Sequence, residues 1–165
     1  MPLLEQGFPV ADRFVPVADD APLPDAPAIV SLARLQREAE ALAGRNVALG
    51  VQVASTTKPE DLAPLLDRVA LLVVEFPKFR DGRGFTIART LRERYGYTGE
   101  IRAVGHILPD QYAFLVRCGF SSVAVPEAAD LSVWAAALGR FHVAYQAAVD
   151  AAPVVSGLRR RLALG

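Results

Sequence analysis

The sequence predicts one α/β domain in which about five mostly parallel strands alternate with helices. Two observations support this class. Short apolar runs that are typical of buried strands recur along the chain, and a segment with helical spacing of its apolar residues follows each of them. Connections of this kind are right-handed crossovers, which place successive strands parallel in one sheet. Five strands are too few for a closed barrel, so we expect an open three-layer sandwich, with a curved half-barrel as the alternative.

The first part of the chain differs in composition from the rest. Residues 1–27 contain six prolines and four aspartates, and only one short β-like run, at 13–17. Clusters of proline and aspartate are typical of loops, so we expect an N-terminal arm rather than a part of the core. Three arrangements are left open for this arm: it folds back over the domain, it packs on a neighbouring subunit, or it is a loosely ordered leader. The expected α/β domain covers 28–152, and a C-terminal tail follows at 153–165.

Strands and helices alternate regularly within the expected domain. A short strand at 28–32 leads into a helix at 33–42, which Gly44 ends. The strand at 70–76 is nearly all apolar, as is typical of a strand covered on both faces. The other expected strands are 47–53, 100–106 and 121–125. The other expected helices are one capped at 55–57 that continues through Leu66, one at 86–95, one between Pro109 and Gly119, and one at 130–150. In such a sheet, functional residues lie at the carboxyl ends of the strands.

Composition limits the classes of partner and compartment. The 165 residues are 52% hydrophobic and 22% charged, and the formal net charge is zero. A neutral chain has no bulk attraction for polyanions, so we expect no nucleic-acid partner. No apolar run approaches the roughly 20 residues of a membrane span, and the N-terminus does not resemble a signal peptide. We therefore expect a cytoplasmic protein without a membrane partner. A homodimer is left open.

The loop that joins the strand at 70–76 to the next helix combines glycines with positive charge. Its candidate ligand-binding residues are Lys78, Arg80, Asp81 and Arg83. Unpaired N–H groups at a helix start favour an anion, and the arginine fork suits oxyanions. We therefore expect the loop to bind a small anionic ligand such as sulfite, sulfate or a phosphate group. The alternative is a solvated loop whose arginines pair with Asp81 and Glu75.

Two neighbouring features are weaker candidates. Gly82 and Gly84 match the start of a dinucleotide-binding pattern, but the third small residue comes late and no acid follows at a strand end about 20 residues on. The spacing therefore argues against a dinucleotide. Arg89 is a further ligand-binding candidate, although Glu93 lies four residues on and can form an ordinary surface pair with it.

A second polar group follows the strand that contains Arg102. The candidate catalytic residues are His106, as an acid or base near neutral pH, and Asp110, which would orient it, and Gln111 is a candidate ligand contact in the same crevice. The alternative is that Asp110 caps the next helix and His106 is a polar strand-end residue. Arg102 lies inside an apolar strand, where a charge needs a partner, and Glu75 is the expected one.

The sequence identifies neither a metal site nor a cofactor. Cys118, His106 and His142 lack metal-ligand spacing. As the single cysteine, Cys118 cannot form an internal disulfide, and we expect it to be a small buried hydrophobe. Without a cysteine cluster there is no ligand set for an iron–sulfur centre, and siroheme would have to come from a partner.

Residues 76–125 resemble a known bacterial family. They read FPKFRDGRGFTIARTLRERYGYTGEIRAVGHILPDQYAFLVRCGFSSVAV, which is similar to the signature of the family called domain of unknown function 934. Genes of that family commonly stand beside assimilatory sulfite reductase, and its members are sometimes labelled probable oxidoreductases of sulfite reduction. The resemblance therefore implies a place in sulfur assimilation, without an established reaction.

Two hypotheses follow. The first, which we favour, is a non-catalytic accessory protein of sulfite assimilation that binds an oxyanion or docks on sulfite reductase. The second is an enzyme, such as an oxidoreductase with a borrowed cofactor, that acts in the crevice between the loop 78–83 and His106 with Asp110. The sequence leaves open whether the protein is an enzyme.

Overall fold

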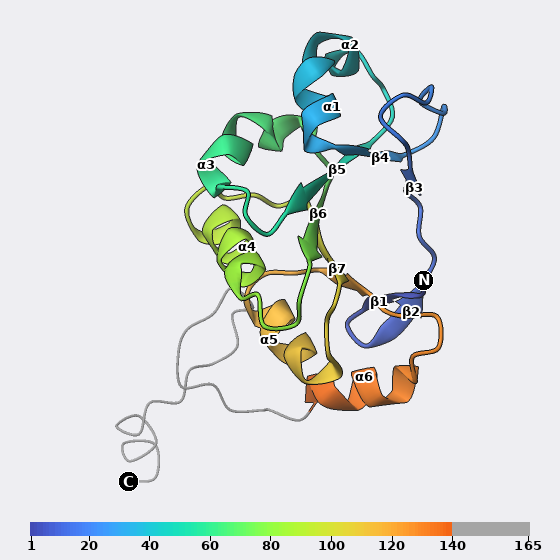
Figure 1. The fold of residues 1–165 in the computed structure, drawn as a ribbon, viewed down its shortest axis with the longest axis vertical. Helices are drawn as coiled ribbons and strands as arrows, with labels where there is room; N and C mark the ends of the chain where they lie inside the picture. The colour runs from blue at the N-terminus through green and yellow to red at the C-terminus, as the bar shows by residue number, and fades with distance from the viewer. Residues whose placement is uncertain (140–165) are drawn as a thin grey trace, which may run out of the picture.

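The computed structural model of the protein describes residues 1–139, and eight of its strands form a single sheet (Figure 1). The strands are β1 (Leu3–Glu5), β2 (Phe8–Val10), β3 (Val15–Pro16), β4 (Ala28–Ser31), β5 (Leu49–Ala54), β6 (Leu71–Phe76), β7 (Glu100–Gly105) and β8 (Ser122–Ala124). Their order is β2-β1-β8-β7-β6-β5-β4-β3. Strands β3 to β8 are mutually parallel, and β1 is antiparallel to both neighbours. The predicted α/β class and mostly parallel sheet are confirmed, with eight strands in place of about five.

The helices fall between the strands as the periodicity predicts, but several are shorter or divided. They are α1 (Leu32–Arg37), α2 (Ala39–Ala43), α3 (Pro59–Leu62), α4 (Arg83–Glu93), α5 (Tyr112–Arg117) and α6 (Leu131–Gly139), with 3₁₀ turns at Ala63–Arg68 and Pro109–Gln111. The expected helix at 33–42 is thus two helices that meet at Glu38. The rest of the helix expected at 130–150, His142 and the tail at 153–165 lie outside the described residues. Among residues 1–139, no helix is long and apolar enough to cross a membrane.

The sheet is strongly curled. Its two edge strands, β2 and β3, are consecutive in the chain and are joined by only residues 11–14. Five Cα steps reach at most about 18 Å, whereas a flat sheet of eight strands would hold its edges about 34 Å apart. A flat sheet is therefore impossible with this connection. Of the two arrangements that the sequence left open, the half-barrel is the one found, and the open three-layer sandwich is not.

Helices cover one face of the sheet, where the larger core lies. Figure 1 shows α3, α4 and α5 together on one side of the sheet and the segment through β3 on the other. The core beneath the helices contains alternate residues of the central strands, because side chains two residues apart point to the same face. They include Val30, Val51, Val53, Leu72, Val74, Ile101 and Ala103.

The N-terminal segment closes part of the opposite, concave face. Residues 1–27, expected as an arm outside the core, supply β1, β2 and β3 and bury Leu3, Leu4 and Phe14. Phe14 is only 3% exposed and packs against Ile29, Leu71 and Val73 on this face. Two of the six prolines that suggested an arm, Pro9 and Pro16, lie in the two edge strands, where a missing N–H donor does not interrupt the sheet.

A buried arginine anchors this segment to the sheet. Arg102 in β7 is 3% exposed, and its guanidinium donates to both carboxylate oxygens of Asp12, at 2.7 and 3.0 Å. It also contacts Glu100 at 3.1 Å, and Ser122 donates to the same Glu100 oxygen at 2.8 Å. The expected pair between Arg102 and Glu75 is therefore wrong. Asp12 lies 90 positions from Arg102 in the chain, so sequence spacing did not reveal it.

Candidate functional site

Phe76, the last residue of β6, positions the two loops that carry the predicted site residues. Its ring lies against Gly84 in the first turn of α4, where an added Cβ would come within 2.5 Å of a ring carbon. Its carbonyl oxygen accepts the backbone N–H of His106 at 2.8 Å. Gly105 has a φ of +99°, and a Cβ there would overlap the same carbonyl. Gly84 and Gly105 are therefore needed for close packing and a left-handed turn, rather than for phosphate contact.

Gln111 joins the two loops. Its Nε2 donates to the Phe79 carbonyl at 2.8 Å, and its Oε1 accepts the Leu108 N–H at 3.0 Å. The structure thus brings the loop after β6 and the loop after β7 side by side, as neighbouring strands require. Since both ends of the Gln111 amide are bonded to backbone, its clearest role is to hold these loops in place.

Asp81 takes the position at the start of α4 where an anionic ligand was expected. Its carboxylate accepts Ser55 Oγ at 2.6 Å, Arg83 Nε and Nη2 at 2.8 and 2.7 Å, and the Arg83 backbone N–H at 3.2 Å. The hydrogen bonds from Arg83, and next the one from Ser55, hold the pKa of Asp81 far below its usual value. The carboxylate in turn raises the pKa of Arg83. The protein's own carboxylate therefore neutralises the strongest anion-binding elements of the loop.

The other predicted ligand-binding cations differ in whether a carboxylate of the protein already pairs with them. Arg89 donates to Glu93 at 2.9 Å across one helical turn, as the alternative interpretation expected. Lys78 and Arg80 are exposed and have no ion pair among residues 1–139. The Arg80 guanidinium lies 5.3 Å from the centre of the Phe79 ring. Only Lys78 and Arg80 of these cations keep their charge available to a partner.

His106 and Asp110 are both exposed at the carboxyl edge of the sheet. In the part of the chain that the structure describes, no hydrogen bond or ion pair joins their side chains to each other. The arrangement expected for an acid or base oriented by a carboxylate is therefore not formed in this structure. Cys118 is buried, as expected for a small hydrophobe.

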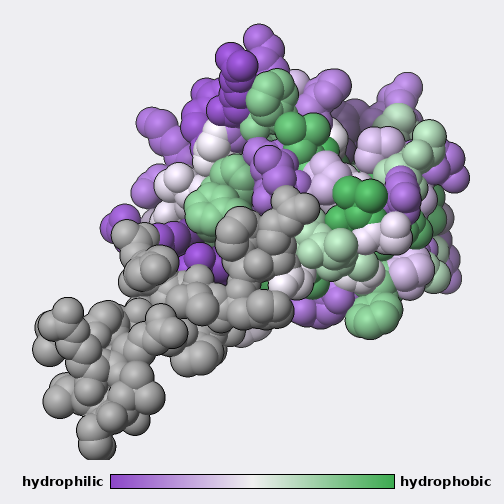
Figure 2. Space-filling view, turned by 90° about the horizontal axis from the view of Figure 1, so that it is seen from below, coloured by the Kyte–Doolittle hydropathy of each residue, from purple (hydrophilic) through white to green (hydrophobic). Residues whose placement is uncertain are grey.

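Large apolar side chains are exposed around these two loops. Phe79 is 46% exposed, Leu108 44% and Phe114 53%. The Phe114 ring lies 4.8 Å from that of Phe85, which in turn contacts Phe76, so the group continues inward into the core. We call Phe79, Leu108 and Phe114, together with Lys78 and Arg80, the carboxyl-edge surface. Figure 2, which views the molecule from below, shows that exposed hydrophobic residues also occur in several groups among hydrophilic ones on that side.

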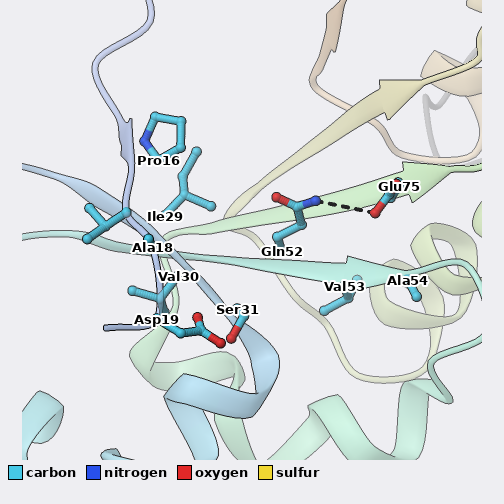
Figure 3. Close-up of a pocket in the computed structure, with 11 residues that line it drawn as sticks. Pro16, Ala18, Asp19, Ile29, Val30, Ser31, Gln52, Val53, Ala54 and Glu75 are labelled. Carbon is cyan, nitrogen blue, oxygen red and sulfur yellow. Dashed lines mark hydrogen bonds between the residues drawn. The ribbon is translucent and has the colours of Figure 1, made fainter. Parts of the chain in front are cut away.

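A groove lies further along the same edge of the sheet, at the ends of β3, β4, β5 and β6 (Figure 3). Its volume is about 480 Å³, and its polar lining includes Asp19, Ser31, Gln52 and Glu75. The sequence analysis did not identify this groove. A signal was present, because Gln52 and Glu75 are polar residues inside otherwise apolar strands and so mark the face that is not covered by helices.

Neither a metal-binding cluster in the described residues nor a curated relative identifies the site, but a family model matches most of the chain. Within residues 1–139, no group of three His, Cys, Asp or Glu residues could hold a metal ion. No curated protein matches the chain. Residues 50–155 match the sequence model of a family described as "Bacterial protein of unknown function (DUF934)".

Proposed function

The chain belongs to the bacterial family DUF934, and from this premise we propose that it is a cytoplasmic, non-catalytic accessory protein of assimilatory sulfite reduction that docks on sulfite reductase. The place in sulfite reduction rests on the resemblance of residues 76–125 to a family whose genes commonly stand beside that reductase. Docking rests on one structural observation, the carboxyl-edge surface.

The carboxyl-edge surface has the composition of a protein interface. Aromatic and arginine residues are enriched at such interfaces, and a few exposed apolar anchors supply most of the binding energy. Here Phe79 and Phe114 are the aromatic anchors, and Lys78 and Arg80 lie beside the first of them without a carboxylate partner among residues 1–139. A partner surface with acidic residues around an apolar centre complements this pattern.

The loops that form the surface are held before any partner arrives. Gln111 fastens the Phe79 backbone to the Leu108 backbone, and Asp81 ties the loop to Ser55 and to the start of α4. Preorganised loops lose less conformational entropy on binding, which favours complex formation.

Docking is a better-supported form of the accessory role than oxyanion binding. Arg83 and the first turn of α4, which were expected to bind the anion, are already bonded to Asp81. A catalytic role for His106 and Asp110 has no comparable support, because neither side chain holds the other in the described residues.

The test is binding between the purified full-length protein and purified sulfite reductase from the same bacterium, measured by biolayer interferometry. The double variant Lys78→Glu/Arg80→Glu is expected to weaken binding by about tenfold or more, because both charges are reversed at the contact. Arg68→Glu is the matched control, since Arg68 is also exposed but precedes β6 and so lies at the opposite edge of the sheet. Absence of a complex with the unmodified protein, or equal losses in the two variants, would reject the docking proposal.

A further inference from the structure

The groove at the ends of β3 to β6 is separate from the carboxyl-edge surface and shares none of the residues that define it. Its volume of about 480 Å³ is typical of small-molecule pockets, which measure roughly 300–1,000 Å³. Its position also agrees with the general rule that parallel sheets bind ligands at the carboxyl ends of their strands. Figure 3 shows that side chains from four chain segments line it.

One wall of the groove is built by residues 17–19, and arginines of α1 hold this wall in place. Arg34 is buried and donates to the Ala18 carbonyl at 2.6 Å, and Arg37 donates to the Asp19 carbonyl at 3.2 Å. Both arginines also bond to Glu38, at 3.0 and 2.8 Å. These hydrogen bonds, the one from Arg37 first, lower the pKa of Glu38. The groove is therefore largely preformed, and the charges of the two arginines behind its wall are already paired.

The inner side of the groove is formed by residues that face away from the helices. In the sheet register, Ser31 lies beside Gln52, and Ala54 lies beside Glu75. The Gln52 amide donates to one oxygen of Glu75 at 3.3 Å, as Figure 3 shows. This bond uses one of the two N–H donors of the amide, and the carbonyl oxygen is left as an acceptor. Beside these polar groups the lining is apolar, with Pro16 and Ile29.

The charge pattern of the groove is one-sided. Glu75 and Asp19 line it, and no lysine, arginine or histidine does so among residues 1–139. Neither carboxylate has an ion pair within that part of the chain. Three other carboxylates in or beside the sheet are paired: Asp12 and Glu100 with Arg102, and Asp81 with Arg83. A groove lined by two exposed carboxylates and no cation is complemented by a ligand that carries positive charge and hydrogen-bond donors.

We propose that this groove binds a small organic cation, an ammonium or guanidinium compound with a short apolar chain. The positive group contacts Glu75 and donates hydrogen bonds to the Gln52 carbonyl oxygen and to Asp19, while the apolar chain lies on Pro16 and Ile29. Binding does not require the docking surface, so either proposal can fail without the other.

The test uses the full-length, ¹⁵N-labelled protein and two pairs of probes of equal chain length. Butylguanidinium and butylammonium are titrated to millimolar concentration, and butyrate and butyramide serve as the anionic and neutral counterparts. The cations are expected to shift the backbone amide signals of Gln52, Ala54 and Glu75 and of 17–19, whereas butyrate and butyramide leave them unchanged.

Two variants test whether the carboxylate of Glu75 supplies the charge that binds the cation. Glu75→Gln keeps the size of an exposed side chain and is expected to weaken binding of butylguanidinium by about tenfold. Glu40→Gln in α2 removes an exposed carboxylate that does not line the groove and is expected to bind as the unmodified protein does. Absence of shifts with both cations, equal shifts with butyrate, or unchanged affinity of Glu75→Gln would overturn the proposal.

Discussion

Among single residues, Asp81 has the largest influence on what the loop after β6 is able to bind. Without its carboxylate, Arg83 and the N–H groups at the start of α4 would face a ligand, as the sequence suggested. With it, four hydrogen bonds are made within the chain, from Ser55 and Arg83. Positive charge at a helix start therefore predicts an anion correctly, but the anion is a side chain of the same loop.

Replacing Asp81 by Asn tests this assignment through acid stability. The folded-state pKa of Asp81 lies below its unfolded value, so its stabilising effect is complete above about pH 4 and is lost as the pH falls toward the folded-state value. Asp81→Asn should therefore be less stable than the unmodified protein at neutral pH, and the difference should shrink below about pH 4. Urea unfolding across this pH range measures it.

The control for this prediction is Glu93→Gln, which removes the exposed pair with Arg89 on the surface of α4. Exposed pairs of this kind contribute little, so its stability should stay close to that of the unmodified protein at every pH. If the difference in stability between Asp81→Asn and the unmodified protein stayed the same in acid, the charge of Asp81 would not be the source of its stabilising effect.

At the scale of elements, the segment between β2 and β3 is fixed by an ion pair rather than by hydrogen bonding of strands. Asp12 lies in the connection at 11–14 and receives two hydrogen bonds from Arg102 in β7. Glu100 is the second carboxylate on Arg102, and Arg13 approaches Glu100 at 3.7 Å. A buried arginine shared between two carboxylates is costly to leave unpaired, which links the N-terminal segment to the centre of the sheet.

Removing Asp12 should therefore destabilise the protein more than its partly exposed position suggests. Asp12→Ala is expected to cost about 2 kcal/mol in the free energy of unfolding, because a buried guanidinium loses two charged hydrogen bonds but keeps Glu100. Asp20→Ala, an exposed aspartate of the same N-terminal segment, should change it by no more than about 0.5 kcal/mol. Equal effects of the two substitutions in chemical denaturation would contradict this role.

At the scale of the whole molecule, the short connection between the two edge strands and the curl of the sheet imply each other. The four residues at 11–14 bridge the concave face, and Phe14 fills the space beneath them with Ile29, Leu71 and Val73. Both edge strands contain a proline, Pro9 and Pro16, which reduces pairing with another chain. The concave face therefore has its own small core, separate from the one beneath the helices.

Phe14→Ala tests whether the smaller core on the concave face can be weakened without weakening the larger core to the same extent. The substitution is expected to cost about 3 kcal/mol, since it removes the largest side chain of the smaller core. Hydrogen exchange should show faster exchange for the amides of Val15 and Val17, which bond to the carbonyls of Pro27 and Ile29. The amides of Val74 and Ala103, whose side chains belong to the larger core, should exchange faster only in proportion to the loss of global stability. Unchanged protection at Val15 and Val17 would contradict the role assigned to Phe14.

The strands and helices could be predicted from the sequence because their signals are local. The apolar run at 70–76 becomes β6, and the four-residue spacing after it becomes α4, with bounds shifted by a few residues. The segment at 1–27 was missed as part of the sheet, because β1, β2 and β3 are only two or three residues long and two of them, β2 and β3, contain a proline. Strands this short have too few residues to show a period.

By itself, the sequence determined the family, the α/β class and the two loops at the carboxyl edge, since each depends on residues close together in the chain. Only the tertiary structure decided the half-barrel, the partner of Arg102 and the groove at Glu75. These depend on contacts between distant segments, such as Asp12 with Arg102 across 90 positions and Ser55 with Asp81 across 26. Such pairings are selected by how the whole sheet curls and which charges it buries together, and no local pattern encodes that choice.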